Sequence, residues 1–159
     1  MKIKTSLVGA FACIAAPLAW AGEMTVSGTG HGQADNTMHA VAEGHMLVEL
    51  RTIYDDFQLD DPANPMNGMT GPCFGAMEVK AGAVAGGGRC LYTDADGDMV
   101  SMQWTPSGLG ADGAVTGDWS VTGGTGKWVE ASGSGDFSSL TDPGTGRNVN
   151  TVSGTVTLP

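Results

Sequence analysis

The chain has 159 residues, with seven basic and seventeen acidic side chains and a formal net charge of −10. An acidic chain repels phosphate backbones and anionic lipid headgroups, so neither nucleic acid nor a membrane surface is expected as a partner. The length is enough for one domain with a hydrophobic core, and glycine is abundant at 26 residues.

The N-terminal segment is typical of a secretory signal peptide. Two lysines precede an apolar run at 7–18, and the triplet Ala-Trp-Ala at 19–21 fits the rule for signal peptidase cleavage. The run is shorter than the roughly 20 residues of a membrane-spanning helix. We therefore expect 1–21 to be removed, leaving a secreted or periplasmic single domain at 22–159 that is not held in a membrane.

Short stretches of alternating residues, separated by turn signals, recur along the remaining chain. No long segment has the i, i+3, i+4 repeat of an amphipathic helix. This pattern predicts an all-β domain, either a closed antiparallel barrel or a sandwich. The predicted strands are 23–30, 44–57, 75–82, 88–94, 98–104, 114–123, 126–137 and 147–158.

The longest predicted strand, 44–57, has two different faces, because alternate side chains point to opposite sides of a sheet. If the barrel core is apolar, the apolar face points inward, and Glu49 and Arg51 are solvated. If the lumen is polar, Glu49 becomes a candidate general base and Arg51 a candidate anion stabiliser. A register shift of one residue exchanges the two outcomes. The apolar face consists of Met46, Val48, Leu50 and Tyr54.

A long segment without strand character follows at 59–72. Its three prolines are incompatible with a central strand. Such a loop is either the lid or rim of a binding mouth or a solvated connector, and both interpretations stay open here.

Two cysteines lie outside the leader, Cys73 and Cys90. An even number in an exported chain predicts a disulfide, which would stabilise the fold by roughly 3 kcal/mol. The two are too far apart for a Cys-x-x-Cys redox motif, so the bridge is expected to be structural.

The segment "DADGD" places Asp94, Asp96 and Asp98 at the spacing of a calcium loop. An EF-hand would need glycine and glutamate where Met99 and Thr105 stand, so that motif fails. An acidic hairpin turn is the favoured interpretation, and a weak calcium site is the alternative. The three histidines have no zinc-ligand spacing, so we expect no metal and no cofactor.

The segment "GGTGKWVEASGSGDF" at 123–137 contains a Gly-Lys pair, but it is not a phosphate-binding loop. That motif requires a hydroxyl residue after the lysine and a glycine five positions before the pair. Trp128 and Val121 occupy those positions. Glycines in a strand instead permit the bends and close approaches that a small barrel needs.

This glycine-rich segment resembles the "GGTGKY-x-GA-x-G-x-G" stretch of the allene oxide cyclase-like and dirigent-like β-barrel proteins. Further resemblance lies in "GRCLYTDADGDMVSMQW" at 88–104 and "GHMLVELR" at 44–51, so that most of 44–137 is covered. The chain departs from the pattern at Glu130, where a small residue is usual. The resemblance implies an eight-stranded antiparallel barrel; a lipocalin-like barrel or a sandwich is the fallback.

The resemblance also implies a choice of functions. Plant members are usually oligomeric and either cyclise an unstable fatty-acid epoxide or steer the coupling of phenoxy radicals, whereas many bacterial members have no known activity. We therefore expect an exported barrel that binds a small apolar or aromatic molecule, and a second copy of the chain is a further expected partner. An enzyme of the cyclase or dirigent type and a structural protein of the envelope are the alternatives.

Candidate residues follow for both of the first two functions. Methionines are numerous and line adaptable apolar pockets, and tryptophans stack on ring-containing ligands, although an ordinary core explains both. The ligand-binding candidates are Trp104, Trp119, Met46 and Met102. The catalytic candidates, if the protein is an enzyme, are Glu49, Arg51, Tyr54, Tyr92 and Asp94.

Overall fold

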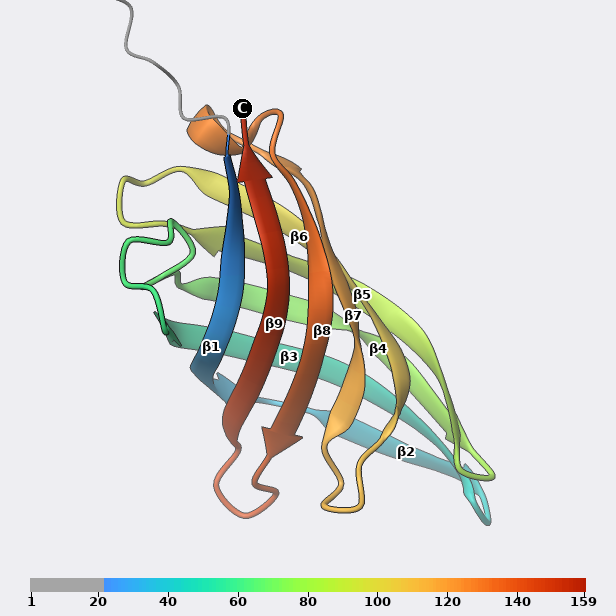
Figure 1. The fold of residues 1–159 in the computed structure, drawn as a ribbon. Coiled ribbons are helices and arrows are strands. Elements are labelled where there is room, and N and C mark those ends of the chain that lie inside the picture. The colour runs from blue at the N-terminus through green and yellow to red at the C-terminus, as the bar shows by residue number, and fades with distance from the viewer. Residues whose placement is uncertain (1–21) are drawn as a thin grey trace, which may run out of the picture.

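The structure is a computed structural model that describes residues 22–159, and the predicted leader lies outside the described residues. Nine strands and one short 3-10 helix follow one another along the described part of the chain (Figure 1). They are β1 (Gly22–Ala34), β2 (Thr37–Ala42), β3 (His45–Leu59), β4 (Gly71–Lys80), β5 (Ala83–Thr93), β6 (Met99–Leu109), β7 (Val115–Gly124), η1 (Gly126–Trp128), β8 (Ser132–Thr141) and β9 (Arg147–Leu158).

Eight of these strands form a closed antiparallel barrel. The hydrogen-bonded order is β1-β9-β8-β7-β6-β5-β4-β3, and β1 pairs with β3 to close the ring. The closing register runs from Gly28 opposite Leu59 to Ala34 opposite Thr52. The predicted fold class, an eight-stranded antiparallel barrel, is therefore confirmed.

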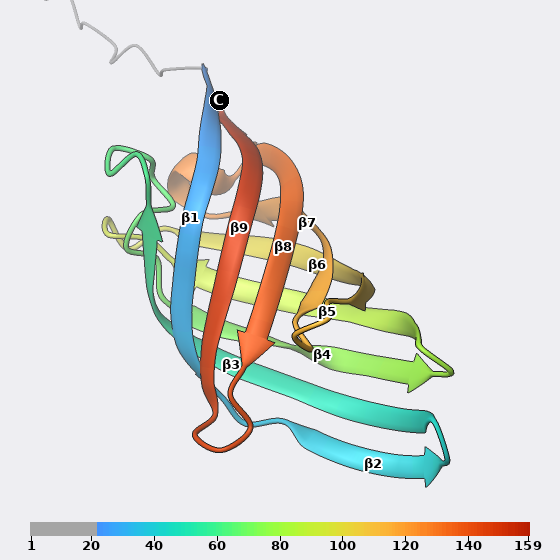
Figure 2. The same ribbon diagram turned by 60° about the horizontal axis from the view of Figure 1, so that its bottom comes forward.

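A ninth strand, β2, was not predicted from the sequence. It pairs with the first part of β3, from Thr37 opposite Glu49 to Ala42 opposite His45, and with no other strand of the described chain. Figure 2 shows β2 running beside β3 at the bottom of the view. All six of its residues are exposed.

The two ends of the barrel differ in how they are covered. The turn at 94–98, the helix η1 and the loop at 60–70 gather at one end, where β3, β5 and β7 finish. The loop folds over this end: Met66 and Met69 are buried, and the buried Asn64 donates from Nδ2 to the carbonyl oxygen of Thr25 at 2.9 Å. The loop is thus a plug, and the solvated-connector interpretation is wrong.

A bulge in β3 shifts which side chains face the interior. His31 pairs with Asp56, but the next residue, Gly32, pairs with Tyr54, so Asp55 has no opposite residue. A single extra residue reverses the alternation of the strand. Tyr54 and Phe57 therefore both point inward, although they are three positions apart.

The predicted disulfide joins Cys73 of β4 to Cys90 of β5. The two residues are directly opposite each other in the β4–β5 ladder, which brings their side chains to the same face. Among residues 22–159, no helix is long and apolar enough to cross a membrane.

Candidate functional site

The interior of the barrel holds a cavity of about 330 Å³. It extends from Phe57 and Met66 at the plugged end to Asn36, Gly113 and Thr141 near the opposite end. Its wall is mainly apolar, and side chains of β3 to β9 contribute to it. The volume falls at the small end of the range of roughly 300–1,000 Å³ that is usual for ligand pockets.

Three aromatic rings form the floor of this cavity. The ring of Phe57 lies 5.1 Å from that of Tyr54 and 5.1 Å from that of Tyr92, measured between centroids, and the two tyrosine rings are 5.8 Å apart. They reach this position because β1 carries glycine on its inner face. A Cβ atom on Gly30 would lie 2.6 Å from the Phe57 ring, so only glycine leaves room for it.

Both tyrosine hydroxyls stay protonated at neutral pH. Burial raises the pKa of Tyr54 to about 12, although the side chains of Ser139 and Asn150 lower it in part. Burial raises the pKa of Tyr92 well above its usual value, and the neighbouring Tyr54 adds to this shift. The hydroxyls are therefore suited to hydrogen bonding or to proton donation, and not to acting as phenolate bases.

A second aromatic wall is built by Trp104, Trp119 and Phe137. The rings of Trp104 and Phe137 meet edge to face, with centroids 6.4 Å apart. The indole nitrogen of Trp119 donates to the carbonyl oxygens of Asp136 at 3.2 Å and Ser153 at 3.1 Å. The indole nitrogen of Trp104 is buried and has no hydrogen-bond partner within the described chain.

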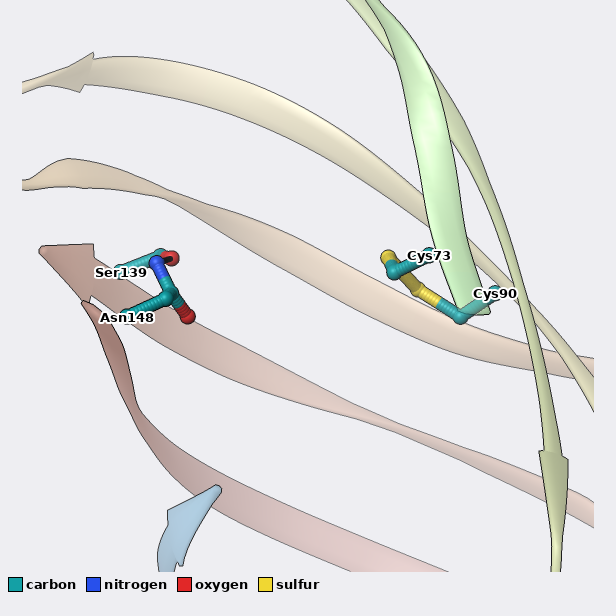
Figure 3. The surroundings of a disulfide bond; sticks show 4 residues. All are labelled: Cys73, Cys90, Ser139 and Asn148. Atoms are coloured by element: carbon teal, nitrogen blue, oxygen red, sulfur yellow. Dashed lines mark hydrogen bonds between the residues drawn. A yellow bond between two sulfur atoms is a disulfide. The ribbon is translucent and has the colours of Figure 1, made fainter. Parts of the chain in front are cut away.

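A polar strip interrupts the apolar wall on β8 and β9. Asn148 donates from Nδ2 to the hydroxyl oxygens of Ser139 and Thr141, each at 2.9 Å, and to the carbonyl oxygen of Leu140 at 3.3 Å. The Oδ1 atoms of Asn148 and Asn150 are buried and unpaired within residues 22–159. Figure 3 shows Ser139 and Asn148 on one side of the interior, across from the disulfide on β4 and β5.

None of the side chains of residues 22–159 that line the cavity is charged. The polar members of the lining are neutral hydroxyl, amide and indole groups. Ionic chemistry between protein and ligand is therefore not built into this cavity, and recognition must come from shape, apolar contact and a few hydrogen bonds.

Six of the predicted site residues line this one cavity. They include all four ligand-binding candidates and two of the five catalytic candidates, namely Met46, Met102, Trp104, Trp119, Tyr54 and Tyr92. The apolar face of the strand predicted at 44–57 points inward, as expected for an apolar core. The roles predicted for these six residues stay predictions.

The other three catalytic candidates lie elsewhere. Glu49 and Arg51 are exposed on the outer face of β3, where the Glu49 carboxylate lies 3.0 Å from Nε2 of His39. Asp94 is buried in the turn at the plugged end and does not line the cavity. The structure thus does not bring Glu49, Arg51 and Asp94 together with Tyr54 and Tyr92, and a polar lumen lined by Glu49 and Arg51 is not formed.

The Gly-Lys pair at 126–127 has a structural role. Lys127 places its ammonium group 2.7 Å from Oδ2 of Asp94 and 2.6 Å from Oδ2 of Asp96, so a protein cation occupies the acidic turn. The prediction of a strand throughout 126–137 is wrong, since η1 occupies 126–128 and β8 begins at Ser132. Within the described chain, no group of three or more His, Cys, Asp or Glu residues is arranged to hold a metal ion.

The polar strip on β8 and β9 was not predicted from the sequence. Asn148 and Asn150 alternate along β9 with the same parity as Val152 and Val156, which are buried. Amide side chains at inward positions of a strand indicate a polar site, because burying a polar group costs free energy unless it is hydrogen-bonded. The sequence "RNVNTVSGTVTL" contains this pattern. No sequence pattern indicates that Met66, in the loop at 60–70, reaches the cavity.

Comparison with known proteins supports the fold. No family model matches the sequence, and no curated protein sequence matches it. Among solved structures, the pterocarpan synthase dirigent protein GePTS1 is similar with a TM-score of 0.51 and 11% identity, covering 95% of this chain and 97% of that one. The pterocarpan synthase dirigent protein PsPTS1 has a TM-score of 0.50 and 12% identity, covering 86% and 96%. The fold is therefore a dirigent-like barrel.

Proposed function

We propose that the protein is an exported barrel that binds one small, mainly apolar, ring-containing molecule in its interior. The observation that carries this proposal is the cavity of about 330 Å³, walled by aromatic and methionine side chains. Tryptophan and tyrosine rings offer flat apolar surfaces with a polar edge, and methionines adapt to irregular ligands. Export is supported by the leader-like segment at 1–21 and by the disulfide.

Guidance of a reaction inside the cavity is the second candidate function. It is supported by the names of the two dirigent proteins with this fold, although a shared fold alone does not transfer an activity. The catalytic candidates that face the cavity are Tyr54 and Tyr92. Their raised pKa values suit them to hold a hydroxyl or carbonyl group of a reactive molecule by hydrogen bonds.

We also propose that the protein associates with a second copy of itself through strand β2. Among the described strands β2 pairs only with β3, so its outer edge is unpaired along its whole length. A free edge offers backbone donors and acceptors to a second chain. A second copy of the protein would add its strand there.

The first test is native mass spectrometry of the mature protein purified from the periplasm, compared with the denatured sample. A small molecule that is released only on denaturation supports the binding function, and the same spectrum reports the oligomeric state. If the protein is empty, titration with the neutral fluorescent probe N-phenyl-1-naphthylamine follows. We expect one probe per chain and an increase of its fluorescence on entering the apolar cavity.

A matched pair of variants locates the binding site. Val48 is buried and lines the cavity, whereas its neighbour Glu49 is on the outer face with a side chain that is 73% exposed. Val48→Trp should fill the cavity and weaken probe binding by about tenfold or more, which corresponds to about 1.4 kcal/mol. Glu49→Trp should bind as the unmodified protein does. Equal affinities in two folded variants would contradict binding inside the barrel.

A further inference from the structure

We infer, building on the proposed function, that the cavity selects a neutral molecule that presents a hydrogen-bond donor to Asn148 and Asn150, and that it rejects ionised acids. The inference rests on buried polar atoms that the protein leaves unpaired, and on the absence of charge from the described lining.

The orientation of the Asn148 amide is fixed by its neighbours. Its Nδ2 atom lies 3.3 Å from the carbonyl oxygen of Leu140, which can only accept a hydrogen bond. The nitrogen must therefore be on that side, and Oδ1 must point the other way. Asn148 is 2% exposed, and its Oδ1 atom has no donor within residues 22–159. A buried acceptor without a donor costs stability, so its retention calls for a partner that comes from outside the chain.

Asn150, two residues further along β9, also leaves its amide oxygen unpaired. Residues two apart on a strand share a face, and both asparagines line the cavity. Asn150 is 9% exposed, and its Oδ1 atom is also buried without a partner in the described chain. Two neighbouring acceptors on one wall match a ligand that brings a hydroxyl or an N–H group to that wall.

The indole nitrogen of Trp104 provides the complementary feature. Trp119 and Trp128 both donate from their indole nitrogens, to backbone carbonyls and to the Asp94 carboxylate respectively. Trp104 is 9% exposed, lines the cavity and has no acceptor among residues 22–159. A ligand oxygen, such as a carbonyl or an ether, would accept this hydrogen bond.

The absence of positive charge from the described cavity lining disfavours carboxylates and phosphates as ligands. No lysine, arginine or histidine of the described chain lines the cavity, so a bound anion would be desolvated without a counter-ion. The amide oxygens of Asn148 and Asn150 would face it with their negative ends. The formal net charge of −10 disfavours the approach of an anion as well. The same molecule in neutral form meets none of these costs.

Three naphthalenes of similar size test the inference. They are 2-naphthol, which donates and accepts a hydrogen bond, 2-methoxynaphthalene, which only accepts, and 2-naphthoate, which is an anion at neutral pH. Each is measured by displacement of N-phenyl-1-naphthylamine from the mature protein. We expect 2-naphthol to bind about three- to tenfold more tightly than the methoxy compound. The naphthoate should bind at least about a hundredfold more weakly than 2-naphthol.

Variants on β9 assign the preference to the two asparagines. Asn150→Leu removes one acceptor and keeps the branched shape of the side chain, so it should lower the affinity ratio of 2-naphthol to 2-methoxynaphthalene. The double change Asn148→Leu and Asn150→Leu removes both acceptors and should bring that ratio close to one. Thr151→Val changes a neighbouring exposed side chain on the outer face and should keep the ratio of the unmodified protein.

The outcomes separate this inference from the proposed function. If the reporter binds but the three naphthalenes do not differ, or if the double variant of Asn148 and Asn150 keeps the ratio, the inference is overturned and the binding function stands. The second of these results would mean that water alone pairs with the two asparagines. Tight binding of the naphthoate also overturns the inference. If neither the reporter nor any naphthalene binds, the proposed function and the inference both fall.

Discussion

The ammonium group of Lys127 lies 2.7 Å from the buried carboxylate of Asp94, and this contact ties the start of η1 to the turn between β5 and β6. The same carboxylate accepts a hydrogen bond from the indole nitrogen of Trp128 at 2.8 Å. Two adjacent residues of the glycine-rich segment thus bind one aspartate of the acidic turn. The contact lies at the plugged end of the barrel, opposite Asn36 and Gly113, and none of its residues lines the cavity.

Removal of the Lys127 charge should destabilise the barrel. Lys127→Met keeps most of the aliphatic stem but leaves the Asp94 carboxylate, 1% exposed, without its cation. We expect a loss of about 1–3 kcal/mol in the free energy of unfolding, measured by urea denaturation. Lys80→Met is the control, because Lys80 is exposed and forms none of the ion pairs found in the described chain. An equally stable Lys127→Met variant would contradict the structural role.

The stability that this ion pair contributes should depend on pH in a defined window. Burial alone would raise the pKa of Asp94, but hydrogen bonds from Lys127, Trp128 and the backbone outweigh it and hold the pKa below 3.8. A lowered carboxylate pKa gives stability that is full above 3.8 and is lost as the pH falls through the folded-state value.

The pKa of Lys127 shifts in the opposite direction. Burial alone would lower its pKa, but Asp94 and Asp96 raise it above 10.5, so its contribution is full below 10.5 and is lost as the pH rises through the raised value. The difference in unfolding free energy between the unmodified protein and Lys127→Met should be constant between pH 3.8 and pH 10.5. This difference should become smaller as the pH falls below 3.8 and as it rises above 10.5. A difference that does not change down to pH 2 would show that Asp94 is not involved.

Calcium should not stabilise the protein through the acidic turn. The position that a cation would take among Asp94, Asp96 and Asp98 is held by the Lys127 ammonium group. A bound calcium ion would have to displace this internal cation and desolvate. We expect no change in melting temperature on adding millimolar calcium to the chelator-treated protein. A calcium-dependent rise that is lost in Asp96→Asn would revive the calcium interpretation.

Reduction of the disulfide should loosen one wall of the cavity. Cys73 and Cys90 join adjacent strands, and both line the interior. Reduction, or the double change Cys73→Ala and Cys90→Ala, should lower the free energy of unfolding by about 3 kcal/mol. Urea denaturation with and without reductant measures this, with thiol titration as the control for complete reduction. The double variant should show no further effect of reductant.

How far the sequence predicts this molecule depends on which interaction places each segment. The strands β1, β3 to β7 and β9 follow from alternation and turn residues, and the disulfide follows from the cysteine count. Strand β2 was missed because all six of its residues are exposed, so it has no buried face to create an alternating pattern. Its position is determined by pairing with β3, which is a tertiary interaction.

The site was only partly predictable, because tertiary interactions also place some of its residues. Alternation correctly groups Met46 and Tyr54 on one inward face, but no local pattern reveals the bulge at Asp55 that turns Phe57 inward as well. Likewise Trp128, which is fully buried, is placed by its bond to Asp94 and not by a strand, so the prediction for 126–137 fails at its beginning. Long-range contacts decide both cases.

Glycine on the inner face of β1 should be required for the aromatic floor. A Cβ atom on Gly30 would meet the Phe57 ring at 2.6 Å, and the ring cannot retreat because Tyr54 and Tyr92 pack against it. Gly30→Ala should therefore lower the free energy of unfolding by about 1–3 kcal/mol, the usual cost of overpacking. Gly22→Ala on the same strand is the control, because its Cβ would meet nothing within 4 Å, and it should change stability by less than about 0.5 kcal/mol.

A second-site change distinguishes overpacking from a general effect on the strand. Phe57→Leu removes the ring that collides with the added methyl group, so Gly30→Ala should cost less in that background than in the unmodified protein. The coupling between two residues in contact is expected at about 0.5–3 kcal/mol, and the two costs would simply add if the residues were independent. Strict additivity in urea denaturation of all four proteins would mean that Gly30 is required for its backbone alone. A clear coupling would show that the bare inner face of β1 makes room for the floor of the cavity.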